Sequence, residues 1–599
     1  MKPVVSDIMV RSFVDRQCLF QIQLRRGDSR KQPLKQPKQP RKTTTFVEER
    51  ASRQQQHQPQ QLSEMGRRPR LVTPPLVLVA LVLVMVLQTA ETKPPLQITT
   101  TAGQFWQITD IHWDWTYNRT GDVSSWCHGA AGDPTADNGL FGNYSCDAPW
   151  VLVKEAVRHM AQVQPQPDFV IWTGDNAPHW EEGPEFKQIF SAIDNITRVM
   201  EEAFPDTPIV PCLGNHDSFP ADFYPGGNKS FYTRYLTEGG WSRLLSEDEQ
   251  RTFATAGYFA RRLTDQLTII SLNTNIYYRP NEAIDPKEAD PGQQFSWLRD
   301  QLKNASTEGY KVIIGAHIAP GFFERQTDDT FMFDNYNEAL LALIGQYSDV
   351  ILAQVYGHEH TDSFRVLGQE APDGELQLQA AMFLAPSVTP WVPAAGTNPG
   401  VRLYSYTPTV LTDYSQYILN LTASNAAGAA AWSRLYAAAD TYSLSDLGVQ
   451  SMAALYRRLV AEPALFDTYY RLNTAGAPVG ETCDLPCKRS QLCAIGHLRT
   501  DAMATCLNSV TTMNSIISGE MLVHGPAGGP GSAPVAGGSG RPSQFLAVFF
   551  GVIAGLAALA ALVAFVVVRV RKRPSAPSTV LRNVASFVSV GSQGYETMT

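Results

Sequence analysis

The chain has 599 residues, 44% of them hydrophobic, and a formal net charge of −8. This length can bury a full catalytic core and a second, smaller module. Of the 49 basic and 57 acidic residues, residues 1–70 carry 16 basic and 6 acidic ones. Residues 569–599 carry 5 basic and 1 acidic residue. The region between them, residues 71–568, therefore has 28 basic and 50 acidic residues. A region so acidic repels long polyanions, and we therefore expect no double-stranded nucleic acid as a partner.

Residues 1–90 have the composition of a leader and a targeting segment. Residues 1–64 are rich in Gln, Arg, Lys and Pro, which indicates either a disordered leader or a start codon set upstream of the true one. Residues 65–90 begin with Met65 and continue with arginines, an apolar run over 76–87 and small residues, which is the layout of a signal peptide. If the leader is translated, the apolar run would instead act as an uncleaved anchor.

Apolar, β-branched runs precede most of the polar motifs farther along the chain. These runs cover residues 105–108, 169–172, 209–213, 311–314 and 350–355. They predict buried strands, and an open α/β sheet binds its ligands just beyond the carboxyl ends of its strands. The motifs that follow the runs are Asp110-Ile-His112, Gly174-Asp175, Gly214-Asn215-His216-Asp217, His317 and Gly357-His358-Glu359-His360.

The residue types in these motifs suit a pair of divalent metal ions. Two ions about 3.5–4 Å apart can clamp a phosphoryl group, and they need imidazoles, oxygen donors and one carboxylate that bridges both ions. We assign Asp175 as the bridge. The remaining ligands would be Asp110, His112 and His360 for one ion, and Asn215, His317 and His358 for the other. Each motif alone is more often a turn or a strand end, but all of them in this order favour the metal site.

The spacing of His358 and His360 supports this assignment. Residues i and i+2 of an extended segment point to the same side, so both imidazoles would converge on the site. The scheme uses four of the eleven histidines of the chain as ligands.

The motif set resembles the calcineurin-like metallophosphoesterase superfamily. Longer matches are similar to its acid sphingomyelinase group, and above all to the acid sphingomyelinase-like phosphodiesterases. They are Asp110-Ile-His-Trp-Asp114, Thr173-Gly-Asp-Asn-Ala-Pro-His179, Gly315-Ala-His-Ile-Ala-Pro-Gly321 and Gly357-His-Glu-His-Thr-Asp362. The similarity covers residues 98–507. It implies an α/β fold, namely a two-sheet sandwich flanked by helices, with a small helical, disulfide-bonded C-terminal domain.

The resemblance also implies the cofactor and two catalytic groups. By analogy with the family, the two metal ions are Zn²⁺. His216 follows the ligand Asn215, so we expect it to project toward the scissile phosphate and to protonate the leaving alkoxide. His179 resembles the family histidine that helps to stabilise the transition state. A structural role is the alternative for both histidines, and we interpret Asp217 and Asp362 as residues that orient ligands.

Three cysteine pairs resemble the disulfide spacings of the family, although the sequence alone leaves the connectivity open. The pairs are Cys127 with Cys146, Cys483 with Cys487, and Cys493 with Cys506. Cys212 lies in a predicted strand and is expected to be a buried thiol. Cys18 lies outside the predicted ectodomain and is interpreted as incidental.

Residues 91–410 are predicted to form the catalytic domain, with helices over 150–162 and 185–204 and a hairpin turn within 370–377. Residues 411–510 are rich in Ala, Leu and Tyr, which predicts a helical C-terminal domain. Residues 511–544 contain a segment rich in Gly, Pro and Ser, which predicts a flexible stalk.

Residues 545–568 are mostly apolar, long enough to span a bilayer, and followed by basic residues. This pattern predicts a single-pass type I membrane protein with a lumenal or extracellular catalytic domain, at the cell surface or in an endosome or lysosome, and with residues 569–599 in the cytosol. A glycolipid-anchor signal is the competing interpretation, but such signals end with their apolar tail. A motif at Tyr595 resembles a sorting signal that an adaptor binds, and a solvated end is its alternative.

All Asn-x-Ser/Thr sequons lie between the two apolar segments, as expected for a lumenal glycoprotein. They begin at Asn118, Asn143, Asn195, Asn228, Asn304 and Asn420.

We expect a metal-dependent phosphoric diester hydrolase in which a bridging hydroxide attacks phosphorus in line with the leaving oxygen. Acid sphingomyelinase carries a Cys-rich lipid-presenting module ahead of its catalytic domain, whereas residues 1–100 contain one cysteine. The expected substrate is therefore a phosphodiester or pyrophosphate with a soluble, nucleotide-type portion. Sphingomyelin, cleaved to phosphocholine and ceramide, is the close alternative. A third hypothesis is an inactive membrane regulator, but the presence of all seven predicted ligands argues against it.

Overall fold

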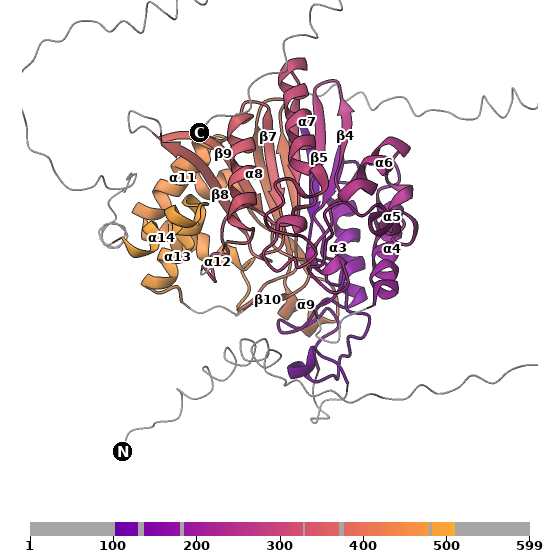
Figure 1. Ribbon diagram of the computed structural model, residues 1–599. Helices are drawn as coiled ribbons and strands as arrows, with labels where there is room; N and C mark the ends of the chain where they lie inside the picture. Colours follow the sequence, from indigo (N-terminus) through magenta and orange to yellow (C-terminus); the bar gives the residue numbers. More distant parts are fainter. Residues whose placement is uncertain are drawn as a thin grey trace, which may run out of the picture. The chain divides into compact units, whose positions relative to one another are not determined.

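Two six-stranded sheets form the centre of the computed structural model, which describes residues 102–509 except 130–136, 180–184, 328–329, 371–375, 394 and 479–481 (Figure 1). The first sheet contains, in spatial order, β14 (Trp432–Ala437), β13 (Leu411–Leu419), β12 (Gly400–Tyr406), β1 (Gly103–Ile108), β2 (Phe169–Trp172) and β3 (Ile209–Pro211). The second contains β4 (Phe259–Thr264), β5 (Leu267–Ser271), β6 (Lys311–Gly315), β7 (Ile351–Tyr356), β9 (Leu376–Leu384) and β8 (Ser363–Glu370). A short ribbon pairs β10 (Trp391–Val392) with β11 (Ala395–Gly396).

Each sheet has a parallel part. Strands β1, β2 and β3 are parallel, and so are β5, β6, β7 and β9. The five apolar runs predicted to be strands correspond to β1, β2, β3, β6 and β7, so this prediction is confirmed. Antiparallel strands complete the sheets, with β12 to β14 beside β1 in the first sheet and with β4 and β8 at the edges of the second.

The two sheets pack face to face. A Cβ added to Gly315 in β6 would lie 2.8 Å from Ile171 Cγ2 in β2, so this glycine permits the close approach of the sheets. The rings of Phe383 in β9 and Tyr404 in β12 have centroids 6.1 Å apart. One continuous apolar layer therefore joins the sheets and sets the relative position of their strand ends. The predicted two-sheet sandwich is confirmed.

Helices flank the sheets (Figure 1). Helix α3 contacts β12, α6 contacts β4, α7 contacts β6 and α8 contacts β9. The helices of this part are α3 (Trp150–Val163), α4 (Phe186–Ala203), α5 (Lys229–Thr237), α6 (Glu247–Ala256), α7 (Gln294–Glu308), α8 (Asp334–Gln346), α9 (Leu421–Ala427) and α10 (Ala438–Tyr442). The predicted helices over 150–162 and 185–204 correspond to α3 and α4.

Helix α4 illustrates how the sequence produces these elements. Its buried residues include Ile189, Ile193, Ile196 and Met200, which are spaced three or four positions apart and so form one apolar face. A capping box at Glu185 satisfies backbone groups at its start. The helix therefore presents one apolar face for burial, while charged residues occupy its exposed side.

The region after residue 410 begins with strands. The prediction of a helical domain from residue 411 is therefore wrong for β13 and β14, which pair with β12 and extend the first sheet. In β13, buried and partly exposed residues alternate: Tyr414, Gln416 and Ile418 are buried, and the residues between them are less buried. The high Ala, Leu and Tyr content of residues 411–510 hid this alternation in the sequence. Helices follow: α11 (Val449–Ala461), α12 (Pro463–Asn473), α13 (Leu485–Gly496) and α14 (Thr500–Asn508).

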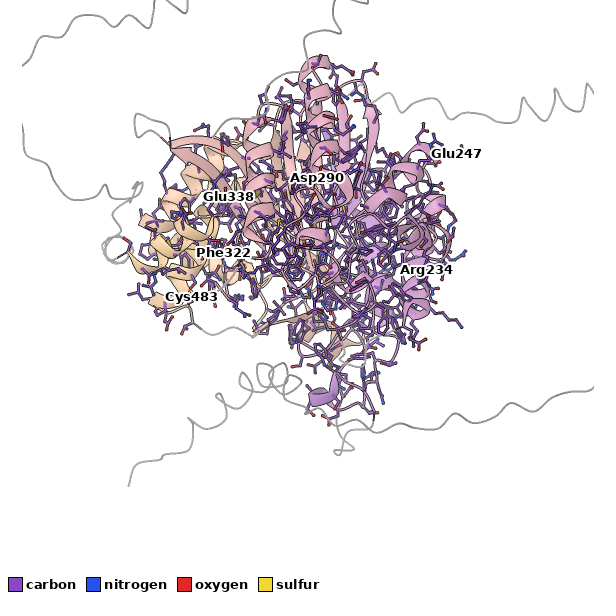
Figure 2. The ribbon with its side chains drawn as sticks, in the orientation of Figure 1. Arg234, Glu247, Asp290, Phe322, Glu338 and Cys483 are labelled. Carbon is purple, nitrogen blue, oxygen red and sulfur yellow. A yellow bond between two sulfur atoms is a disulfide. The ribbon has the colours of Figure 1, made fainter. Side chains whose placement is uncertain are left out.

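Disulfides close this helical region. Cys483 bonds to Cys487 and Cys493 to Cys506, and farther up the chain Cys127 bonds to Cys146, so all three predicted pairs are confirmed. Cys212 is a buried free thiol, as predicted, and burial raises its pKa to about 12. Phe322 packs with Cys493, Cys506 and Met503 in a small separate core; Figure 2 labels Phe322 beside the C-terminal helices, and Cys483 just before α13.

The predicted localisation requires a correction. In the part of the chain that the structure describes, no helix is both long and apolar enough to cross a membrane. The longest helix there, α4, has 18 residues but carries Lys187, Asp194 and Arg198. The C-terminal end of this part is the disulfide-bonded helical region. A single-pass type I membrane protein is therefore unsupported, and the span predicted over 545–568 lies outside the described residues.

Other predictions also fall outside the described residues. They are the leader, the signal peptide, the stalk and the Tyr595 motif, and they stay predictions. The sequon asparagines lie within the described part and are all at least partly exposed. Their glycosylation also stays a prediction.

A buried ion pair joins the sheets. The Arg402 guanidinium, from β12, lies 2.5 Å from Asp362 Oδ1 and donates to the Leu384 carbonyl at the end of β9. The second oxygen of Asp362 accepts a hydrogen bond from the Tyr436 hydroxyl. Both charged side chains are almost completely buried. The Asp362 carboxylate therefore connects the two sheets. Our interpretation of Asp362 as a residue that orients a metal ligand is wrong.

Replacing Arg402 should destabilise the protein strongly. Arg402→Met would leave the Asp362 carboxylate buried without its cation, and we expect the free energy of unfolding to fall by roughly 3–5 kcal/mol. Urea unfolding of the full chain measures this change. Arg434→Met, on the exposed face of β14, is the matched control and should change stability by less than about 0.5 kcal/mol. Equal unfolding midpoints for the two variants would contradict the role of this pair.

Candidate metal centre

The predicted ligands lie at the carboxyl ends of strands from both sheets. Asp110 and His112 follow β1, Asp175 follows β2 and Asn215 follows β3, all in the first sheet. His317 follows β6, and His358 and His360 follow β7 in the second sheet. The face-to-face packing of the sheets brings these ends together, so residues separated by up to 250 positions meet in one buried cluster.

The Asp175 side chain lies between histidines that follow strands of the two different sheets. Its Oδ2 atom is 3.3 Å from His112 Nε2 and 3.1 Å from His317 Nε2. Its Oδ1 atom accepts a hydrogen bond from the His216 backbone N–H. One carboxylate oxygen thus faces a histidine from each sheet, which is the position that a bridging ligand requires.

Two groups of potential ligand atoms share this carboxylate. Asp110, His112, Asp175 and His360 form one group, and Asp175, His317 and His358 form the other; within each group the atoms lie within 4.8 Å of one another. Asn215 belongs with the second group because its Oδ1 atom lies 2.9 Å from His317 Nε2 and 2.9 Å from His358 Nδ1. The structure therefore brings all seven predicted ligands together in the two sets that we expected.

The ring orientations fit a cation. The Nδ1 atoms of His112, His317 and His360 each lie 2.7 Å from a backbone carbonyl oxygen, those of Ala177, Thr173 and Trp391. A carbonyl can only accept, so each Nδ1 carries a proton and Nε2 is the nitrogen that can offer a lone pair to a metal ion. The Nε2 atoms of His112 and His360 lie 3.1 Å apart. Two facing lone pairs without a hydrogen between them repel each other, and a metal ion would remove this repulsion.

Burial lowers the pKa values of three of the four histidine ligands, and the nearby carboxylates act in the opposite sense. Burial lowers the pKa of His112 to about 4 and also lowers the pKa values of His358 and His360, so these rings stay neutral and can bind metal. His317 differs: burial lowers its pKa, but the Asp175 and Asp110 carboxylates and the Thr173 carbonyl together outweigh burial and raise the pKa to about 9. Without a metal, a proton on His317 supplies positive charge at this position.

The backbone at the site is strained. Five of the seven predicted ligands have positive φ angles: Asp110 (48°), His112 (39°), Asp175 (57°), His358 (74°) and His360 (60°). Each such residue costs on the order of 1–3 kcal/mol, which the surrounding packing must offset. Our premise that His358 and His360 lie on an extended segment is therefore wrong. They converge because the chain turns sharply after β7, and each turn aims one imidazole at the site.

Two glycines allow the loops to approach. A Cβ on Gly357 would lie 2.0 Å from Thr109 Oγ1 and 2.5 Å from Asp110 Oδ2. A Cβ on Gly214 would lie 2.0 Å from the Asp175 backbone N. Any side chain at these positions would push the ligand-bearing loops apart, which explains why a glycine precedes Asn215 in one motif and His358 in the other.

Asp217 ties two of the loops together. Its carboxylate accepts hydrogen bonds from the backbone N–H groups of Gly214, Asp175 and Asn176, and from the Asn176 side chain. All four groups can only donate, so they stabilise the ionised carboxylate. Asp217 therefore holds the Asp175 loop against the Asn215 loop, in agreement with the predicted orienting role.

His216 and His179 lie beside the ligands. Their ring centroids are 4.4 Å apart, and the ring of His216 is 5.3 Å from that of His112. Both line the same cavity as Asp175 and His358, and both are partly exposed. One nitrogen of His179 also lies within 4.8 Å of nitrogens of His112 and His360, so its position alone would suit a ligand as well. Their catalytic roles stay predictions.

Three polar residues at the site were not among the predicted site residues. Asp147 binds the ring of His179, Asp222 accepts a hydrogen bond from the Asn215 amide, and Arg279 lines the cavity. The Asp222 contact turns the Asn215 oxygen toward the histidines. For Asp147, the one signal in the sequence that could have pointed to the site was its position directly after Cys146. Asp222 and Arg279 lie in no short motif.

The cavity at this site has a volume of about 450 Å³. Aromatic side chains line much of it, including Tyr278, Phe323, Phe331 and Trp391. The rings of Tyr278 and Phe331 lie 5.1 Å and 4.9 Å from that of His358. A small substrate therefore has a polar, ligand-rich side and an aromatic side to bind.

Comparison with known proteins agrees with this site. Residues 103–362 match the family model of calcineurin-like phosphoesterases, and residues 378–513 match that of the acid sphingomyelin phosphodiesterase C-terminal region. Human acid sphingomyelinase-like phosphodiesterase 3b is 34% identical over 417 residues, which cover 68% of this chain and 90% of that protein. The chain belongs to the acid sphingomyelinase-like phosphodiesterase family.

Other relatives show similar coverage. Sphingomyelinase phosphodiesterase C of Dictyostelium discoideum is 35% identical over 418 residues, 68% of this chain and 92% of the relative. Human cyclic GMP-AMP phosphodiesterase SMPDL3A is 35% identical over 418 residues, 68% of this chain and 90% of the relative. This phosphodiesterase is thus an enzyme, a phosphoric diester hydrolase. Its calcineurin-like phosphoesterase region implies a dimetal centre, for which the buried Asp and His clusters supply the ligands.

Replacing Asp175 should abolish metal binding at both predicted metal positions. Elemental analysis of the purified full chain should give close to two metal ions for the wild type, and Asp175→Ala should lose both because each set of ligands includes this carboxylate. Asp300→Ala, on the exposed side of α7, is the matched control and should keep the wild-type metal content. A variant without Asp175 that retains one full equivalent would contradict the shared position.

Proposed function

We propose that this phosphodiesterase is zinc-dependent and hydrolyses phosphodiester or pyrophosphate bonds of nucleotide-type substrates. The observation that carries the proposal is the pair of ligand clusters that share Asp175 and line a cavity of about 450 Å³. Four imidazoles among seven ligands favour zinc, because magnesium and calcium prefer sets made up of oxygen atoms.

The side chains would divide the chemistry between them. Zinc ions held by Asp110, His112 and His360 and by Asn215, His317 and His358, with Asp175 shared, would lower the pKa of a water nucleophile and neutralise charge on the phosphoryl oxygens. His216 would protonate the leaving oxygen, which departs in line with the incoming nucleophile. His179 would help to stabilise the transition state by accepting, at Nε2, a hydrogen bond from the incoming nucleophile or from a substrate hydroxyl.

The cavity wall favours a substrate with a base and more than one phosphate. Arg279, Gln326 and Thr330 bring polar groups to the wall, and a guanidinium binds phosphate with good geometry. Tyr278 and Phe331 offer aromatic faces against which a base can stack. Relatives named cyclic GMP-AMP phosphodiesterase support a nucleotide-type substrate.

Sphingomyelin is the second candidate. Phe219 and Phe223, both 39% exposed, lie a few residues after His216, where apolar side chains can meet the acyl part of a lipid. A Dictyostelium discoideum relative named sphingomyelinase phosphodiesterase C supports this candidate. The two candidates differ in what they require of the protein: a nucleotide requires the polar wall of the cavity, whereas a sphingolipid requires an apolar surface at its mouth.

His216→Ala should test the general acid. We expect kcat to fall by roughly 10²–10⁴-fold for a substrate with an alkoxide leaving group, while metal content stays at the wild-type level. The loss should be smaller for a nitrophenyl ester, because nitrophenolate leaves without a proton. His159→Ala is the matched control, since His159 stacks on Trp432 away from the cavity. Equal losses for good and poor leaving groups would remove His216 from the acid role.

Arg279→Gln should separate the two substrate classes. Loss of a charged hydrogen bond to a second phosphate costs about 1.5–3 kcal/mol, so KM for nucleoside diphosphates or triphosphates should rise roughly 10- to 100-fold. Hydrolysis of detergent-dispersed sphingomyelin, which has one phosphate, should change little. Arg299→Gln, on the exposed side of α7, is the control. Faster wild-type hydrolysis of sphingomyelin than of every nucleotide tried would favour the second candidate.

A further inference from the structure

A buried carboxylate holds His179 at two points. Asp147 Oδ2 accepts a hydrogen bond from the His179 backbone N–H at 2.7 Å, and Asp147 Oδ1 lies 2.9 Å from His179 Nδ1. Oδ1 also accepts from the Thr389 hydroxyl at 3.2 Å. Asp147 is 1% exposed, and neither our ligand scheme nor the proposed chemistry uses it. These contacts fix the rotation of the imidazole within its own plane.

Two aromatic rings fix the plane itself. The His179 ring stacks on the metal-site ring of His112, with centroids 3.7 Å apart and planes 27° apart. The Trp126 ring is stacked with it as well, with a centroid distance of 5.8 Å and an interplanar angle of 9°. With Nδ1 directed at Asp147, Nε2 is the nitrogen left to face the cavity that His179 lines.

One disulfide delivers both neighbours of this ring. Cys127 is bonded to Cys146, Trp126 directly precedes the first cysteine, and Asp147 directly follows the second. Backbone hydrogen bonds from Ala148 N–H to the His112 carbonyl and from Asp114 N–H to the Ala148 carbonyl join Ala148, the residue after Asp147, to the segment that carries His112. The Cys127–Cys146 disulfide and these hydrogen bonds therefore connect the orientation of His179 to the metal site.

We propose that Asp147 is a positioning residue that holds His179 with its proton on Nδ1 and Nε2 toward the substrate, and that the Cys127–Cys146 disulfide keeps Asp147 and Trp126 in place for this purpose. This inference rests on the proposed participation of His179 in phosphodiester hydrolysis. A carboxylate only accepts hydrogen bonds, so it selects the tautomer that donates from Nδ1.

Asp147→Asn inverts this selection with little change in size. The amide oxygen can still accept from the His179 backbone N–H, but the amide NH₂ then faces Nδ1 and donates to it, which moves the ring proton to Nε2. A misdirected catalytic group costs roughly 10- to 100-fold in rate. We expect such a loss in kcat for the zinc-loaded full chain, with KM and metal content near wild type.

A double-mutant cycle separates positioning from mere stability. Once His179 is absent, Asp147 has nothing to orient, so Asp147→Asn should change kcat by less than about twofold in a His179→Ala background. Equal losses in the two backgrounds would overturn the inference, as would wild-type activity of His179→Ala. Loss of metal from His179→Ala would make that residue a ligand and would also overturn it. Asp137→Asn, at an exposed position between the two cysteines in the sequence, is the matched control and should leave kcat unchanged.

A spectroscopic measurement keeps the inference testable without activity. In the zinc-loaded full chain labelled with ¹⁵N-histidine, the His179 signal, identified by its absence in His179→Ala, should report a proton on Nδ1 in the wild type and on Nε2 in Asp147→Asn. The same tautomer in both proteins would overturn the inference. If the wild type cleaves no phosphodiester at all, the proposed function fails, while the tautomer measurement still decides the role of Asp147.

Discussion

The architecture of this enzyme depends on one carboxylate held between two sheets. Asp175 comes from the first sheet, and its Oδ2 atom lies within 3.3 Å of His112 from the same sheet and within 3.1 Å of His317 from the other. Metal ligation tolerates errors of only a few tenths of an ångström, so the sheets must hold a fixed separation. The tight contact at Gly315 and the buried pair of Arg402 with Asp362 provide this fixed separation.

The C-terminal region supports the loops that carry the metal site. Strands β13 and β14 complete the first sheet, and helix α12 ends at Asn473, whose amide donates to Glu324 and to the Asp362 carbonyl. Glu324 in turn pairs with Arg365, which also pairs with Glu359 between two predicted metal ligands. The two family models therefore describe halves of one folded unit, because the second half supports loops of the first.

The loops at the site store strain that the rest of the fold stabilises. Positive φ angles at five predicted ligands are tolerated because Asp217, the backbone carbonyls that accept from the histidine rings and the Cys127–Cys146 disulfide restrain the site from several directions. The same restraints leave His216 and His179 partly exposed at the cavity, where substrate can reach them. Rigid support and an accessible face are both needed at a catalytic centre.

The sequence by itself determined the elements whose signal is local. Apolar runs predicted five strands, and motifs at their ends predicted seven ligands that the fold brings together, because strand burial and ligand chemistry both depend on residue type at short range. The tertiary structure decided what depends on distant partners. Strands β13 and β14 are strands because β12 lies beside them, and His358 and His360 converge through sharp turns that no spacing rule describes. Asp147, Asp222 and Arg279 carry no motif, and only folding places them at the site.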